Sequence, residues 1–156
     1  SGVIRSLLEG WDLPQTLRVT KEILKEHPRW NRFSFREANY LTDSLGSRDF
    51  DLILISNVTR IEDEPSNRKI IKKAYQALKP QGKLVIHDFT IEANRTAPKF
   101  SALLALHLLL FTGKGSVYTL DEYRTWMKDV GLNKISHIPI ASDSIHPSVA
   151  IVGAKS

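Results

Sequence analysis

Four side chains that could bind a ligand or move a proton occur in two pairs, and each pair closes an apolar run. Ser56 and Asn57 end the first run, and His87 and Asp88 end the second. Hydroxyl, amide, imidazole and carboxylate groups hold polar ligands, and the last two can also exchange protons. The sequence around these pairs therefore has to be examined for elements that would bring them to one place.

One helix length of chain separates the two runs. Residues 65–78 carry Ile70, Ile71 and Ala74 at helical spacing, with basic residues between them. A strand, an amphipathic helix and a second strand are typical of parallel strands joined by a crossover. Ligands bind such sheets at the carboxyl ends of the strands, so both polar pairs are expected at the rim of one site.

The N-terminal part of the chain predicts three elements. Residues 2–9 indicate a short helix that Gly10 would stop, and residues 12–27 indicate a longer helix that ends at Pro28. Residues 33–36 alternate as a half-buried strand does.

The C-terminal part begins with a turn at residues 80–82, after the helix at 65–78. Thr119 and Glu122 have the spacing of a capping box, which predicts the start of a helix. Residues 135–140 and 148–154 alternate as the two strands of an antiparallel hairpin.

Composition limits the class of protein. A length of 156 residues with 42% hydrophobic content suits one domain over residues 1–156. Residues 100–111 form the longest apolar stretch, which contains Ser101 and His107 and falls short of the roughly 20 residues of a membrane span. It predicts a buried helix or the wall of an apolar pocket. The chain has no cysteine and no secretion signal, so a cytoplasmic location is expected.

The net charge of +5, from 22 basic and 17 acidic residues, raises the question of nucleic-acid binding. The basic residues of segment 18–32 are interleaved with Glu22 and Glu26, which favours a solvated helix face with local ion pairs. Base-stacking aromatic residues do not accompany them. A nucleic-acid partner is therefore not expected.

The order and spacing of these segments resemble a known family. Residues 50–58, 77–89 and 117–132 are similar to the C-terminal two thirds of the catalytic domain in S-adenosylmethionine-dependent O-methyltransferases of the caffeate and acetylserotonin type. Residues 11–14 resemble that family's acidic turn after its second strand, and residues 35–40 its third strand and the turn that follows. The resemblance implies an α/β fold with a doubly wound, Rossmann-like sheet and a terminal antiparallel hairpin.

The first two strands of that sheet have no counterpart in the predicted elements. Only Gly2, a cofactor-binding candidate, stands where the family's glycine-rich loop would end, and residues 10–11 alone occupy the place of its second strand. The strand at residues 50–56 would then have a bare apolar edge. The sequence could be part of a longer protein, another polypeptide or a swapped copy could supply the strands, or the protein could be a non-catalytic relative.

The resemblance also implies which residues hold S-adenosylmethionine. Asp12 corresponds to the acceptor of the ribose hydroxyls, and Asn39 and Tyr40 fall where the family contacts adenine. Ser56 and Asn57 face the cofactor from the rim. Two structural alternatives stay open, in which Asp12 is a helix N-cap and Asn39 a turn residue.

The family's general base is missing from its usual place. The family has a histidine shortly after its fourth strand, where this chain has Arg60, and an arginine side chain cannot accept a proton at neutral pH. Arg60 could instead hold an anionic acceptor, or form a surface ion pair with Glu62, Asp63 or Glu64.

Two histidines could replace that base. His107 lies in the apolar stretch that lines the family's acceptor pocket, where the alternative is an ordinary core residue. His87 is less favoured, because strand alternation turns it away from the face that Asp88 uses.

The sequence thus predicts a methyltransferase that passes a methyl group from S-adenosylmethionine to a small aromatic or polyketide-like acceptor, chiefly by orienting the reactants. A homodimer is compatible with the resemblance, and no metal site or membrane contact is expected. The alternative is a catalytically inactive, methyltransferase-like binding or scaffold module.

Overall fold

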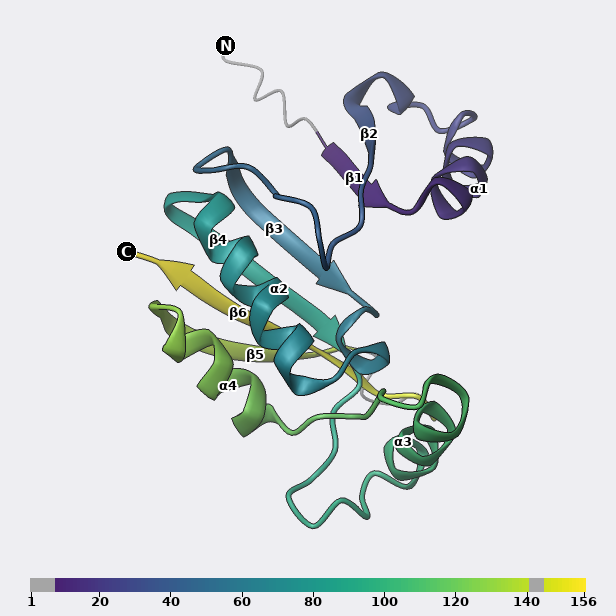
Figure 1. Cartoon of the computed structure of the whole chain (residues 1–156), viewed down its shortest axis with the longest axis vertical. Helices are drawn as coiled ribbons and strands as arrows, with labels where there is room; N and C mark the ends of the chain where they lie inside the picture. The colour runs from purple at the N-terminus through teal and green to yellow at the C-terminus, as the bar shows by residue number, and fades with distance from the viewer. Residues whose placement is uncertain (1–7, 141–144) are drawn as a thin grey trace. The chain divides into compact units, whose positions relative to one another are not determined.

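The computed structural model describes residues 8–140 and 145–156 (Figure 1). The chain divides into two compact units, residues 1–44 and residues 45–156. Whether the two units act as one domain over residues 1–156 stays a prediction. No helix within the described residues is long and apolar enough to span a membrane.

The first unit contains a pair of parallel strands. Strand β1 (Leu8–Asp12) pairs with β2 (Phe33–Glu37), in a register that runs from Leu8 opposite Phe33 to Asp12 opposite Glu37. Helix α1 (Pro14–Leu24) and the short helix η1 (Trp30–Arg32) connect them. The parallel pairing places the carboxyl ends of both strands at the same edge, with the Ala38 amide donating to the Asp12 carbonyl over 3.1 Å.

The helix predicted over residues 2–9 is wrong where the structure describes it, because Leu8 and Glu9 belong to strand β1. The same observation corrects the expectation that residues 10–11 alone occupy the place of a strand before Asp12. Glycine suits position 10 because any Cβ there would lie only 3.2 Å from the Phe35 ring on β2, closer than ordinary van der Waals contact. Pairing with β2 therefore decides the conformation of this segment, which is too short for its hydrophobic pattern to predict a strand.

The second unit is built on a mixed four-stranded sheet. Its strands are β3 (Phe50–Ser56), β4 (Leu78–Asp88), β5 (Leu132–Ile140) and β6 (Ser148–Lys155), in the order β3-β4-β6-β5. β3 and β4 are parallel, whereas β6 is antiparallel to both β4 and β5. The crossover and the terminal hairpin are both confirmed.

Helices α2 (Glu64–Ala77) and α4 (Leu120–Asp129) lie along one face of this sheet, as Figure 1 shows. The core between these two helices and the sheet consists of fully or almost fully buried side chains, among them Ile71, Leu84, Ile86, Trp126 and Ile151. The capping box of α4 is confirmed: the Thr119 hydroxyl accepts from the Glu122 amide over 3.1 Å, and the Glu122 carboxylate accepts from the Thr119 amide over 2.6 Å.

β3 stands first in the strand order of the second unit and exposes Leu52 and Leu54 by 55% and 58% of their surface. The turn predicted at residues 80–82 is instead part of β4. There the register jumps from Leu78 opposite Phe50 to Lys83 opposite Leu52, and Gln81 has a positive φ of 64°.

Helix α3 (Lys99–Thr112) contains the apolar stretch at residues 100–111 and packs against the short helix η2 (Thr59–Ile61).

Candidate active site

The carboxyl ends of β3 and β4 meet, as the crossover requires. Ser56 lies opposite His87 in the register, and the Asn57 amide donates to the His87 carbonyl over 2.9 Å. Asn57 then takes a φ of 59°, a left-handed conformation that asparagine tolerates better than most residues. This reversal leads the chain into η2 and brings Arg60 to the end of β4.

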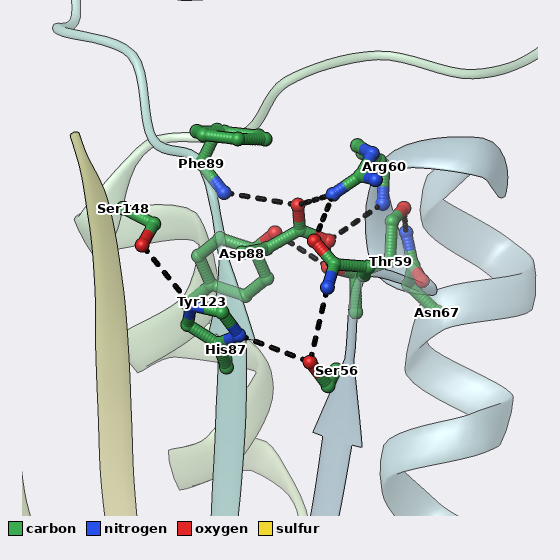
Figure 2. A network of polar contacts seen from close by, with 10 residues as sticks. Ser56, Thr59, Arg60, Asn67, His87, Asp88, Phe89, Tyr123 and Ser148 are labelled. Atoms are coloured by element: carbon green, nitrogen blue, oxygen red, sulfur yellow. Dashed lines mark hydrogen bonds and ion pairs between the residues drawn. The ribbon is translucent and has the colours of Figure 1, made fainter. Parts of the chain in front are cut away.

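The carboxylate of Asp88 is the centre of a polar network (Figure 2). One oxygen accepts from the Thr59 hydroxyl at 2.7 Å and from the Arg60 amide at 3.2 Å. The other accepts from the Arg60 guanidinium and the Phe89 amide, both at 2.9 Å. Asp88 is fully buried, so these donors replace the water that its charge would otherwise bind.

Tyr123 completes this network from α4. Its hydroxyl lies 2.7 Å from the Thr59 hydroxyl, which itself donates to Asp88, so Tyr123 is the donor in this contact. Burial, and secondly the charge of Asp88, raise the pKa of Tyr123 well above its ordinary value. The phenol therefore stays neutral and adds no second negative charge beside the carboxylate.

Asn67 and Tyr118 hold the segment that carries Arg60. The side-chain Nδ2 of Asn67 donates to the backbone carbonyls of Thr59 at 2.8 Å and Glu62 at 3.2 Å. The Tyr118 hydroxyl donates to the same Glu62 carbonyl at 2.6 Å. Burial raises the pKa of Tyr118 to about 12. These buried bonds fix η2 to α2 and to the segment before α4.

A second polar chain lies on the opposite face of β4. His87 bonds through Nδ1 to the Ser56 hydroxyl and through Nε2 to the Ser148 hydroxyl, both at 3.0 Å. The side chain of Asn57 joins the two sets of polar contacts. Its Nδ2 donates to the Ser56 hydroxyl at 3.1 Å, and its Oδ1 accepts from the Arg60 guanidinium. The opposite orientations predicted for His87 and Asp88 are thus observed, and both imidazole nitrogens are engaged within the protein.

The surface pair predicted for Arg60 is wrong. Arg60 pairs with Asp88, which is distant in sequence, while the three nearby carboxylates have other roles. Glu62 pairs with Lys114, Asp63 accepts from the Ser66 amide as the N-cap of α2, and Glu64 pairs with Arg68. The cap lowers the pKa of Asp63 through its bonds to Ser66. Arg60 is therefore a structural partner of a buried charge rather than a surface cation.

His107 is not a core residue, which corrects the alternative drawn from its apolar surroundings. It lies exposed on α3, and its ring stands 4.3 Å from that of Phe111. Leu108, the next residue, is the one that points into the small apolar cluster with Ile91 and Val117. An exposed imidazole on this helix is open to solvent and to ligands.

The remaining candidates belong to the first unit, apart from Gly2, which lies outside the described residues. Asp12 ends β1, and its Oδ1 accepts from the Leu13 amide at 2.7 Å. The N-cap of α1 is Leu13, so the capping role considered for Asp12 is wrong. Asn39 forms the expected turn, its side-chain oxygen accepting from the Leu41 amide at 2.9 Å, and Tyr40 is half-buried beside it.

Sequence reasoning missed Thr59, Asn67, Tyr123 and Ser148 as parts of this network. One signal was available, because an aspartate on the inward-facing phase of a buried strand must find several donors nearby. Which donors it finds depends on the packing of α4 and η2 against the sheet, which the sequence does not display.

The O-methyltransferase domain model matches residues 6–133. The chain belongs to this family. It is 29% identical over 143 residues to a 3-hydroxy-5-methyl-1-naphthoate 3-O-methyltransferase of Streptomyces sahachiroi, a match that covers 92% of this chain and 41% of that protein. Acetylserotonin O-methyltransferase of Gallus gallus is 26% identical, with 80% of this chain and 35% of that protein covered.

A solved structure has the same fold. The O-methyltransferase family 2 protein from Planctomyces limnophilus, in complex with apigenin, superposes with a TM-score of 0.85 at 29% identity, covering 95% of this chain and 43% of that one. The α/β, Rossmann-like fold class and the resemblance to O-methyltransferases are thereby confirmed. The chain spans about two fifths of the length of the curated relatives it matches.

Proposed function

We propose that the protein transfers a methyl group from S-adenosylmethionine to an oxygen of a small aromatic or polyketide-like acceptor. Membership of the O-methyltransferase domain family is the observation that carries this proposal. The names of relatives agree with it, since one methylates a naphthoate and another acetylserotonin. One solved relative, human N-acetylserotonin methyltransferase, is described in complex with S-adenosylmethionine and shares the fold at 19% identity.

The strand ends of the first unit suit the adenosine part of this cofactor. Asp12 is half-buried, and its Oδ2 accepts no hydrogen bond from the described residues, whereas ribose hydroxyls need an acceptor. Asn39 is exposed two residues beyond the end of β2, where its Nδ2 can donate to a purine nitrogen. Asp12 and Asn39 would thus bind ribose and adenine, with Tyr40 beside them.

Ser56 and Asn57 are proposed to face the cofactor from the end of β3. Both are exposed, and the bond between their side chains holds the amide of Asn57 in a fixed orientation. S-adenosylmethionine, when bound, supplies an electrophilic methyl group on a sulfonium. The protein would then act chiefly by holding donor and acceptor in line.

For an acceptor with a neutral hydroxyl, His107 is the proposed general base. Its ring is exposed on α3 and engaged only with the Phe111 ring among the described residues.

A cytoplasmic location and a homodimer remain predictions.

An inactive binding module is the alternative, and Arg60 is the observation that favours it. A residue bound to a buried carboxylate occupies the position where the family has its base. Such a protein would bind S-adenosylmethionine and release it unchanged.

Titration calorimetry of the purified protein with S-adenosylmethionine and S-adenosylhomocysteine tests the cofactor site. Asp12→Ala should weaken binding by about 1 to 3 kcal/mol, because the ribose hydroxyls lose their acceptor. Glu22→Ala is the matched control, since it removes an exposed carboxylate of the same unit that pairs with the exposed Lys25. Equal affinity in the two variants would remove Asp12 from the site.

A further inference from the structure

The guanidinium of Arg60 keeps donors that the protein does not use. Nη1 donates to Asp88 and to Asn57. Nε and Nη2 donate to no group among residues 8–140 and 145–156. The side chain exposes 22% of its surface, which leaves room for a ligand oxygen at this edge of the sheet.

An aromatic surface continues from this guanidinium. The Arg60 guanidinium lies 5.3 Å from the centre of the Phe89 ring, and Phe89 stands 5.0 Å from Phe100. Phe100 in turn lies 4.2 Å from the ring of His146. A planar ligand can pack its ring on such a surface while one of its oxygens meets the unused N–H groups.

We propose that Arg60 binds the acceptor as an aryloxide, an aromatic hydroxyl that has already ionised, and that this oxygen receives the methyl group. The inference rests on the proposed methyltransferase function and specifies its acceptor class. The hydroxyl proton leaves to solvent before the transfer. A bond then forms between the aryloxide oxygen and the methyl carbon, the sulfonium carbon–sulfur bond breaks, and its electron pair passes to sulfur.

The charged groups around Arg60 define what this site can select. Asp88 balances the charge of Arg60, so the attraction for an anion comes from short, directed N–H bonds rather than from a long-range field. Tyr123 stays neutral, and Glu62 is paired with Lys114. His87 reaches Arg60 only through Ser56 and Asn57.

Two directed bonds favour phenols and enols that ionise near neutral pH over ordinary alcohols. Such acceptors need no general base, which accounts for an arginine where the family has a histidine. Acceptor acidity then takes the place of proton removal by the protein.

The test uses 4-nitrophenol, whose ionised form is coloured, bound to the purified protein in the presence of S-adenosylhomocysteine. A pH titration of the bound probe should give an ionisation at least about one pH unit below that of the free probe, because the guanidinium stabilises the anion. Nitrobenzene, the neutral control, should bind independently of pH. Wild-type protein that binds neutral 4-nitrophenol more tightly than its anion would overturn the proposal without any variant.

Arg60→Lys gives the second measurement. Lysine keeps a positive charge beside Asp88, which protects the fold, but it lacks the planar fork of donors. Affinity for 4-nitrophenolate should fall about tenfold, with nitrobenzene binding unchanged. Arg68→Lys, which alters an exposed arginine of α2, should bind both ligands as the wild type does. Equal affinity of wild type and Arg60→Lys for the anion would also contradict the proposal.

The same samples separate this inference from the function on which it rests. Methylation of phenols with no dependence on Arg60 would leave the methyltransferase standing and remove the aryloxide site. Binding of 4-nitrophenolate through Arg60 without any methyl transfer would retain the anion site and remove the proposed activity.

Discussion

Arg60 and Asp88 form an ion pair across 28 positions of sequence, with Nη1 of Arg60 2.9 Å from Oδ1 of Asp88. Asp88 is fully buried, whereas Arg60 keeps part of its surface exposed. The pair joins the segment after β3 to the end of β4, at the edge where a parallel sheet binds its ligands. Arg60 stands at the family's base position but cannot accept a proton at neutral pH, and here it serves as the partner of a buried carboxylate.

Replacing Asp88 by asparagine should destabilise the protein by about 3 kcal/mol, because Arg60 then loses the partner of its charge. Urea unfolding monitored by circular dichroism measures the change. Asp51→Asn is the control, since Asp51 pairs with Lys79 on the same sheet but is exposed, and its loss should matter little. Similar small effects in both variants would show that the buried pair does not hold the strand ends together.

Tyr118→Phe should weaken the fold at neutral pH by about 1 kcal/mol, the typical net value of the hydrogen bond to the Glu62 carbonyl. Its alkaline behaviour should differ as well. The pKa of Tyr118 is raised from 10.0 in the unfolded chain to about 12 in the fold. Its contribution is therefore fully present below pH 10.0 and is lost as the pH rises toward about 12.

Unfolding free energies measured on both sides of that window decide the point. The stability difference between wild type and Tyr118→Phe should shrink as the pH rises, because only the wild type loses this contribution. Burial, the largest cause of the raised pKa of Tyr123, is common to both proteins, so that part of its shift cancels in the comparison. A difference that stays constant with pH would mean that Tyr118 ionises alike in the folded and unfolded states.

Asn57 offers a matched pair of substitutions. Its φ of 59° lies in the left-handed region, where glycine is unstrained and alanine costs about 1 kcal/mol or more. Both variants lose the contact with Arg60, so their difference isolates the backbone. Asn57→Ala should unfold at lower denaturant concentration than Asn57→Gly, and equal midpoints would contradict a strained reversal after β3.

His107→Gln separates two routes for the acceptor proton. With a neutral aliphatic alcohol, loss of a positioned base should reduce turnover by about 100-fold. With an acidic phenol that binds ionised, the rate should stay close to that of wild type. Initial rates on the two acceptors give both answers, and an equal large loss on both would argue for His107 as base in every case.

Residues with strong local signals made much of the fold predictable. The apolar run from Phe50 to Ser56 and the capping box at Thr119 both lie where the sequence placed them. Strand β1 was not predictable, because five residues that include Gly10 depend on hydrogen bonds to β2. A tertiary partner rather than local preference fixes such a segment.

The location of the site was predictable from the sequence, but its network of hydrogen bonds and ion pairs was not. Ser56, Asn57, His87 and Asp88 follow from the rule that polar residues at the ends of parallel strands share an edge. The partner of Arg60 did not follow, since Glu62, Asp63 and Glu64 all lie within four positions of it, far closer in sequence than Asp88. The chain reverses at Asn57 with a left-handed φ, and the Arg60 guanidinium that follows bonds to Asp88 at the end of β4.

Transfer of a labelled methyl group tests the central proposal most directly. The purified protein is incubated with S-adenosylmethionine carrying a deuterated methyl group and with a panel of phenols, enols and aromatic acids, and the acceptors are analysed by mass spectrometry. We predict a labelled methyl ether on an acidic phenol or enol, formed in equal amount with S-adenosylhomocysteine and strongly reduced in Asp12→Ala. Binding of S-adenosylmethionine without label in any acceptor of the panel would contradict the proposed activity and favour the inactive binding module.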